Sequence, residues 1–150
     1  MLKKITLLLL LCSFWSCGYT PLYLKKNDLD RPIKIATLNG DPKINRMIMS
    51  FLGIKENKNI ESGYTLILNS TKKIDTVSKD KSGNPSVYRS SIIVNFSLSN
   101  EDVIIKQKEF NSSFTYNNSQ NKFDLSQYQK NIEVNLINEI SEKIFIFLKS

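Results

Sequence analysis

The sequence predicts an α+β fold: a two-layer sandwich in which two helices cover one face of a four-stranded, mostly antiparallel sheet. Three observations support this prediction. Stretches in which apolar residues alternate, typical of half-buried strands, occur four times. One amphipathic segment with helical spacing lies between the first and the second of these stretches, and a second such segment follows the fourth. The order is therefore strand, helix, strand, strand, strand, helix, and each apolar face needs a partner layer.

The first strand is predicted over residues 33–38, where apolar residues alternate, and Asn39 with Gly40 should end it. Asp41 then has a side chain suited to cap a helix, and Pro42 follows in the first turn, where a missing N–H costs nothing. Gly53 should terminate this helix. Its apolar stripe, which we expect to face the sheet, consists of Ile44, Met47, Ile48, Phe51 and Leu52.

The second strand is predicted from Gly63 to Ile74, with a possible extension to Val77. A turn-rich connection over residues 78–85 leads to the third strand, which has the strongest alternation. One parity of that strand is apolar and the other contains Arg89, Asn95 and Ser97; the apolar members are Tyr88, Ile92, Val94, Phe96 and Leu98.

A hairpin turn over residues 99–102 connects to a fourth strand, predicted from Val103 to about Tyr116. Its apolar residues in one register are Ile104, Phe110, Phe114 and Tyr116. Lys106 and Lys108 are polar residues on that same parity, which indicates either a bulge or an edge position.

A long terminal helix follows, for which Asp124 and Gln127 have the spacing of a capping box. About 25 residues at 1.5 Å each would span some 37 Å, enough to cross a four-stranded sheet. The predicted inner stripe consists of Leu125, Tyr128, Ile132, Leu136, Ile137, Ile140, Ile144 and Leu148.

The sheet face away from the helices should be only partly polar. Four residues of the opposite parity are apolar: Ile67, Ile93, Val103 and Ile105. Because an uncovered apolar face usually marks a binding surface, we expect one there.

The first residues predict export and lipidation. Lys3 and Lys4 precede an apolar stretch over residues 5–11, which is too short for a transmembrane helix. Ser16 directly before Cys17 is typical of a lipoprotein cleavage site, so we expect acyl chains on Cys17. The alternatives are an ordinary signal peptide with an incidental cysteine, or an uncleaved anchor. The predicted organisation is a signal peptide (1–16), a lipidated tether (17–31) and a single domain (32–150).

The composition narrows the class of function. The formal charge is +7, and removing Lys3 and Lys4 leaves +5. This positive charge indicates anionic lipid headgroups as a partner, although it could equally serve solubility alone. Nucleic acid is a less suitable partner, because export would place the chain on the other side of the membrane. The sequence has no histidine, and neither cysteine remains available as a thiol after cleavage and acylation. Zinc sites, Ser-His-Asp triads and Cys-His pairs are therefore excluded, and we expect no enzyme and no cofactor.

The mature chain resembles the lipopolysaccharide-assembly lipoprotein family, LptE. The resemblance depends first on the opening heptapeptide that runs from Cys17 to Tyr23, Cys-Gly-Tyr-Thr-Pro-Leu-Tyr. It continues in the order of the elements, in Tyr88-Arg89 at the start of the third strand, and in the amphipathic terminal helix.

The resemblance implies a non-catalytic outer-membrane lipoprotein on the periplasmic side, in a one-to-one complex with the barrel protein LptD. There it would plug the barrel, assist its assembly and help lipopolysaccharide reach the outer leaflet. It also implies that basic residues near the loop between the second and third strands bind lipopolysaccharide, which by position are Lys79, Lys81 and Arg89. Lys79 and Lys81 could equally belong to a solvated turn, and Arg89 could only support strand pairing. The alternative function is a stand-alone envelope lipoprotein that binds a soluble ligand or peptidoglycan.

Overall fold

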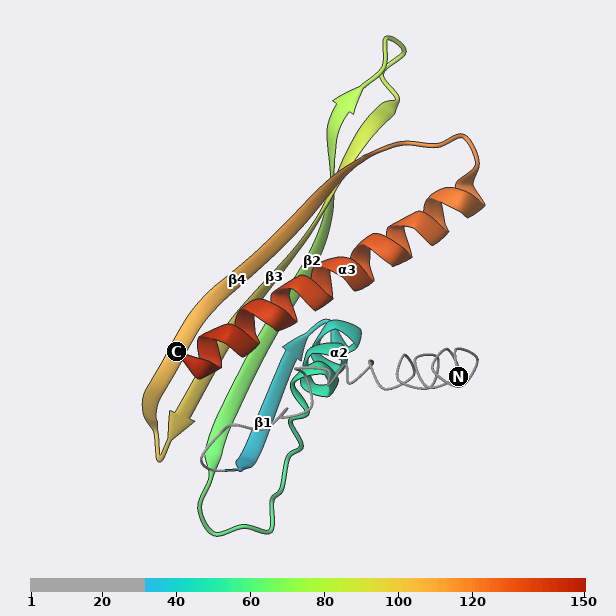
Figure 1. Cartoon of the computed structure of the whole chain (residues 1–150). Coiled ribbons are helices and arrows are strands. Elements are labelled where there is room, and N and C mark those ends of the chain that lie inside the picture. Colours follow the sequence, from blue (N-terminus) through green and yellow to red (C-terminus); the bar gives the residue numbers. More distant parts are fainter. Residues whose placement is uncertain (1–31) are drawn as a thin grey trace, which may run out of the picture.

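The computed structural model of the protein describes residues 32–150. The elements of this part, in chain order, are β1 (Ile33–Gly40), α2 (Pro42–Leu52), β2 (Tyr64–Lys79), β3 (Pro85–Asn100), β4 (Val103–Asn117) and α3 (Lys122–Lys149) (Figure 1). The predicted signal peptide and the tether with Cys17 lie outside the described residues. Neither helix within residues 32–150 combines the length and the apolar character that a membrane crossing requires.

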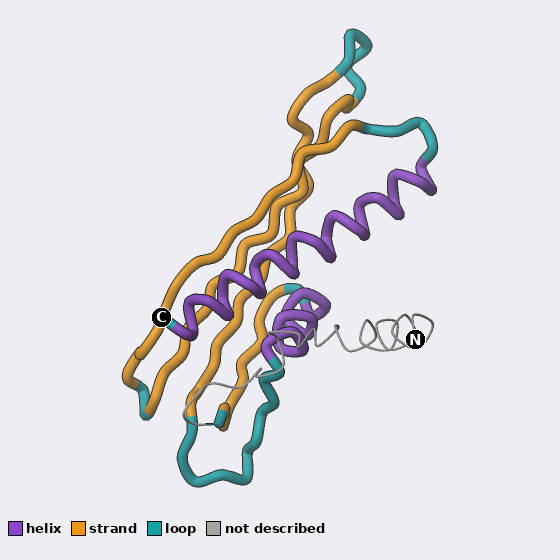
Figure 2. Tube along the Cα trace, in the orientation of Figure 1, coloured by secondary structure: helices purple, strands orange, loops and turns teal. Residues whose placement is uncertain are grey.

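The strands form one sheet in the order β1-β2-β3-β4. β1 is parallel to β2, whereas β2, β3 and β4 form an antiparallel meander. Both helices lie on the same side of this sheet, with α3 along β3 and β4 and α2 against β1 and β2 (Figure 2). The predicted two-layer α+β sandwich, with a mostly antiparallel sheet, is confirmed.

Helix α2 begins and ends where the sequence predicts. The Asp41 carboxylate accepts hydrogen bonds from the backbone N–H groups of Lys43 (2.8 Å) and Ile44 (3.2 Å), and Pro42 occupies the first turn. At the other end Gly53 is in the left-handed region at φ 65°, and its N–H bonds to the last carbonyls of the helix. These local signals alone were sufficient to define the element.

The first strand continues further than predicted, through Asn39 to Gly40. Gly40 pairs with Ser70 in the parallel ladder and has φ +84°. A Cβ at this position would lie 1.9 Å from the Ser70 carbonyl oxygen, so the two backbones approach as closely as they do only because residue 40 has no side chain. The glycine therefore does not break the strand; it allows the strand to turn directly into α2.

The core lies between the helical layer and one parity of β2 and β3. Successive strand residues point to opposite faces, and the residues of even number on these two strands face the helices. Their buried apolar members meet the inner stripes of α2 and α3. The apolar residues that are almost completely inaccessible are Ile44, Ile48, Leu52, Leu66, Leu68, Ile92, Val94, Phe96, Ile137, Ile140 and Ile144.

Helix α3 begins earlier than the predicted capping box at Asp124. Its cap is Asn121, whose side-chain oxygen accepts hydrogen bonds from the N–H groups of Phe123 (3.1 Å) and Asp124 (3.3 Å). Asn121 Nδ2 in turn donates to Asp124 Oδ2 at 2.7 Å. Asp124 therefore lies inside the first turn, where a negative charge suits the helix N-terminus, and the prediction that it caps the helix was wrong.

The inner stripe of α3 is buried as predicted, except that Leu148 is partly buried and Tyr128 is exposed. The Tyr128 side chain is 46% exposed. Its ring meets Tyr116 edge-on, with centroids 5.9 Å apart. Tyr116 belongs to β4, the edge strand of the sheet that residues 32–150 form.

Strand β4 shows both of the predicted features: it is an edge strand and it contains an irregularity. Leu98 pairs with Lys106, but the next residue of β3, Ser99, pairs with Ile104, so Ile105 is extra. Because of this shift Ile104 and Phe110 point to opposite faces of the sheet. The prediction that they share one register was therefore wrong for Ile104. The predicted turn is confirmed: Glu101 and Asp102 both have positive φ, as a two-residue hairpin turn of type I′ requires.

The sheet face opposite the helices is partly polar, as predicted. Ile67, Ile93, Val103 and Ile105 are all exposed. Val103, however, pairs with Asn100 and therefore has the helix-facing parity, because Ile105 is the extra residue; its predicted place on the outer face was wrong. A row of polar side chains crosses all four strands between Ile67 and Ile93; this row consists of Asn39, Asn69, Asn95 and Glu109. This row separates Ile67 from Ile93, so the apolar residues of this face do not form one continuous surface.

Candidate functional site at the β2–β3 hairpin

The β2–β3 hairpin ends in a loop, residues 80–84, that is held in shape by Asp80. Its Oδ1 accepts hydrogen bonds from the backbone N–H groups of Ser82 (2.8 Å) and Asn84 (2.9 Å). The Asp80 N–H donates to the Asn84 carbonyl at 2.8 Å. The backbone N–H of Asn84 does most to lower the pKa of the exposed Asp80 carboxyl, because the bond stabilises its charged form. The Asp80 side chain thus organises the backbone of the loop from which Lys81 projects.

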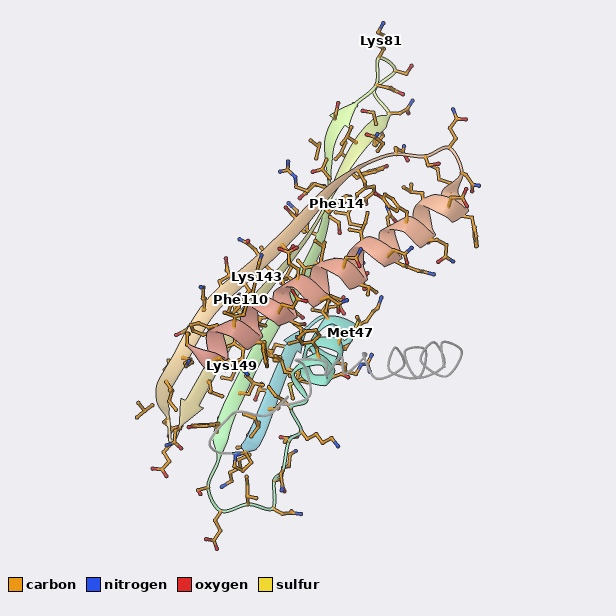
Figure 3. All side chains as sticks on the ribbon, viewed as in Figure 1. Met47, Lys81, Phe110, Phe114, Lys143 and Lys149 are labelled. Carbon is orange, nitrogen blue, oxygen red and sulfur yellow. The ribbon has the colours of Figure 1, made fainter. Side chains whose placement is uncertain are left out.

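Lys79 and Lys81 lie at this hairpin end, as the sequence placed them. Lys79 is the last residue of β2, and Lys81 follows within the loop. Both are exposed, and Lys81 extends from the tip of the molecule, away from the sheet and the helices (Figure 3). Within residues 32–150 neither ammonium group is in an ion pair. Their charge is therefore available to an anionic partner.

Arg89 does not join these two lysines. It lies further along β3, opposite Asp75 of β2 and Thr115 of β4. Its Nε donates to Thr115 Oγ1 at 3.3 Å, and Asp75 forms a 2.8 Å ion pair with Lys73. Arg89 lies four positions after Pro85 on the extended strand, about 13 Å away. The structure thus divides the predicted set, and the contacts of Arg89 are those of a residue that supports strand pairing.

A buried ion cluster lies nearer the centre of the molecule. Glu133 of α3 is 5% exposed; its Oε1 is 2.6 Å from Lys43 Nζ of α2, and its Oε2 binds Lys72 of β2. Burial alone would raise the pKa of Glu133, but the hydrogen bonds from Lys43 and Lys72 outweigh it and lower the pKa below the ordinary value. The cluster links three elements, and both oxygens of its carboxylate are already bound by lysines. Within residues 32–150 no group of His, Cys, Asp or Glu is placed to hold a metal ion.

Neither a protein-family model nor a curated protein matches the sequence. Solved structures do match. The rare lipoprotein B of Shewanella oneidensis aligns with a TM-score of 0.59 and 12% identity, over 76% of this chain and 92% of that one. A minor lipoprotein of Acinetobacter baumannii gives 0.56 and 13%, over 75% and 90%. Lipoprotein B of Nitrosomonas europaea gives 0.55 and 10%, over 79% and 87%.

This chain has the fold of these lipoproteins. At such identities the likeness concerns the fold alone. The alignment covers most of each solved chain, so the lipoprotein fold accounts for the whole arrangement of helices and sheet and not only for one motif.

The lipoprotein fold of this chain carries a second charged feature that the sequence prediction missed. A groove of about 440 Å³, here called the C-terminal groove, lies between β4 and the last turns of α3. Its lining includes Lys108, Phe110 and Asn111 of β4, and Lys143, Ile146 and Phe147 of α3. The sequence did contain a signal for this groove: Lys106 and Lys108 lie on the otherwise apolar parity of β4, and Lys108 lines the groove. We interpreted the two lysines only as evidence of a bulge or an edge strand.

Proposed function

We propose that the protein is a non-catalytic lipoprotein of the lipopolysaccharide translocon in the outer membrane. In this role it occupies the lumen of the barrel protein LptD in a one-to-one complex, assists assembly of the barrel, and helps lipopolysaccharide enter the outer leaflet. The opening heptapeptide that begins at Cys17 and the lipoprotein fold both support the proposal.

The observation that carries the proposal is the basic end of the β2–β3 hairpin. Beyond Val87, which pairs with the last residue of β4, the hairpin consists of two strands only. Lys79 and Lys81 there have no ion-pair partner within residues 32–150. A narrow projection with available ammonium groups is suited to contact the phosphates of a glycolipid, because charge-assisted hydrogen bonds to phosphate are strong.

The proposed location rests on the N-terminal sequence. Acyl chains on Cys17 hold the mature protein on a membrane, since each buried CH₂ contributes about 0.8 kcal/mol. The residue after Cys17 is Gly18. An aspartate at this position would favour retention at the inner membrane, so the glycine is consistent with sorting to the outer membrane. The domain would then lie on the periplasmic side of the outer membrane.

Affinity purification of the tagged full-length protein from outer membranes tests the proposal. We expect an outer-membrane barrel protein to co-purify in a one-to-one ratio, as measured by mass spectrometry. A matched purification of the Cys17→Ala protein should recover much less of the barrel, since the anchor brings the two together. If a monodisperse lipoprotein is recovered without any barrel, the proposal fails and a stand-alone envelope lipoprotein that binds a soluble ligand or peptidoglycan is favoured.

A further inference from the structure

The C-terminal groove has an apolar floor with an exposed wall. The rings of Phe110 and Phe147 form the floor and meet edge to face, with centroids 5.7 Å apart. Ile146 lines the groove beside them, although its side chain is 67% exposed. Because burial of such a side chain is favourable, an apolar ligand would gain free energy from contact with it.

The edge of the same groove is cationic. Lys108 Nζ lies 5.6 Å from the ring centroid of Phe110 and 5.5 Å from that of Phe147, and it forms no ion pair in the part of the chain that the structure describes. Lys143 Nζ is held in place by the Asn111 carbonyl (3.0 Å) and Glu139 Oε1 (2.7 Å). Lys108 is therefore an ammonium group without a compensating carboxylate, directly above an apolar floor.

One acidic residue also lines the groove. Glu109 follows Lys108 on β4 and therefore has the opposite parity, where it pairs with Asn95 in the polar row of the outer sheet face. A negative ligand on the aromatic floor would thus meet Lys108 and Lys143 on its own side of the strand.

A neighbouring depression shows that this combination is specific to one part of the β4–α3 seam. That depression, of about 250 Å³, has apolar and neutral polar lining, including Phe114, Tyr128 and Leu136. Its charged lining residue is Glu139, which already binds Lys143 and Ser112. No lysine or arginine lines this second depression. Of the two, only the C-terminal groove therefore offers positive charge to an anionic ligand.

We infer that the C-terminal groove binds a monoacyl glycerophospholipid. Its chain lies against Phe110, Ile146 and Phe147, and its phosphate meets Lys108 and Lys143. The volume of about 440 Å³ is near the lower end of the roughly 300–1,000 Å³ usual for small-molecule pockets, so the groove suits one acyl chain and not several. The inference goes beyond the proposed function, because this site is separate from the hairpin and requires no barrel partner.

Photolabelling in membranes tests the inference. Isolated membranes containing the full-length protein are incubated with lysophosphatidylglycerol that carries a diazirine near the end of its chain, and labelled peptides are identified by mass spectrometry. We expect labelling of the segments around Phe110 and Ile146. Lys108→Gln should lower labelling about tenfold, as expected for loss of one charged hydrogen bond, and Ile146→Asp should abolish it.

The controls separate this site from the hairpin and from general attraction to membranes. Lys81→Gln removes the same charge at the hairpin tip and should leave labelling unchanged. A monoacylglycerol with the same diazirine chain lacks the phosphate and should label weakly. Resistance to protease establishes that each variant is folded. Equal labelling by the uncharged probe, equal loss in Lys81→Gln and Lys108→Gln, or labels elsewhere in the chain would each overturn the inference, whatever the outcome of the barrel purification.

Discussion

Lys43 of α2 and Glu133 of α3 form a 2.6 Å ion pair whose carboxylate is almost completely buried. The other oxygen of Glu133 binds Lys72 of β2. One carboxylate therefore joins both helices to the sheet. The two lysines keep part of their side chains in solvent, which lessens the desolvation cost that burial imposes on such clusters.

Glu133→Gln should destabilise the domain by about 2 kcal/mol, because two hydrogen bonds lose the charge that strengthens them. The free energy of unfolding, from urea titration, measures this. Glu142→Gln is the matched control, since Glu142 is exposed on the same helix, and it should change stability by less than about 0.5 kcal/mol. Equal effects of the two substitutions would show that the cluster contributes nothing.

Stability should fall in acid. The pKa of Glu133 is lowered in the folded protein, so its ion pairs stabilise the fold above the ordinary glutamate value of 4.5, and this contribution is lost as the pH falls through the folded-state pKa. The pKa of Glu139 is lowered as well, first by its hydrogen bond with Lys143. Urea midpoints should therefore be steady near neutral pH and decline below pH 4.5. In Glu133→Gln the decline should be shallower, and an identical decline would mean that other groups cause it.

Gly40→Ala should be strongly destabilising, by at least about 2 kcal/mol, since left-handed φ and a backbone clash act together. Gly83→Ala is a matched control because Gly83 has the same φ of +84° but no atom within 4 Å of the added methyl group. It should cost only about 1–2 kcal/mol from its backbone conformation. Thermal melts of both variants give the comparison. If Gly83→Ala proved the more harmful, the close approach to Ser70 would not be the reason for glycine at position 40.

Reversing the charge of both Lys79 and Lys81 to glutamate should weaken binding of lipopolysaccharide and flatten its dependence on salt, because surface charge attraction is screened by ions. The fold should be unaffected, as both side chains are exposed. Lys55→Glu is a suitable control, because Lys55 is exposed in the loop that precedes β2, whereas the hairpin follows β2 at its other end (Figure 1). Binding measured at two salt concentrations is the readout, and unchanged affinity would remove the two lysines from the site.

Cys17→Ala should leave the precursor uncleaved, because the thiol that receives the lipid is then absent. Mass spectrometry of the protein from whole cells detects this as a retained signal peptide and a missing lipid mass. Cys12→Ala is the control and should mature normally, since the large Leu11 before Cys12 makes that position a poor cleavage site. Normal maturation of Cys17→Ala would refute lipidation at this residue.

Local sequence signals predicted most of the fold. Asp41, Pro42 and Gly53 define α2 through short-range hydrogen bonds, and alternation identified every strand. The misplaced cap of α3 was a local error, since Asn121 makes the capping bonds expected of Asp124. Two other errors arose where a contact between distant segments decides the outcome. Gly40 continues a strand only because Ser70 lies beside it, and Ile104 changes face because β4 has an extra residue opposite β3.

The candidate sites were harder to predict from the sequence, because they too depend on contacts between distant segments. Lys79 and Lys81 are close in sequence, so their common place was predictable. The separation of Arg89 depends on the length of the strand pairing between β2 and β3. The C-terminal groove joins residues of β4 to residues of α3 that lie more than thirty positions later, and only the register of the helix against the strand brings them together.

The hairpin beyond Val87 also differs from the rest of the sheet in what holds it. It has neither a third strand nor buried apolar residues from the core, so the strand pairing there and the bonds of Asp80 are its main restraints. Regions of this kind open locally at low free-energy cost. We expect the amide protons of this tip to exchange with solvent far sooner than those of Leu68 or Val94, so the projection can adapt its shape to what it meets while the body of the domain stays closed.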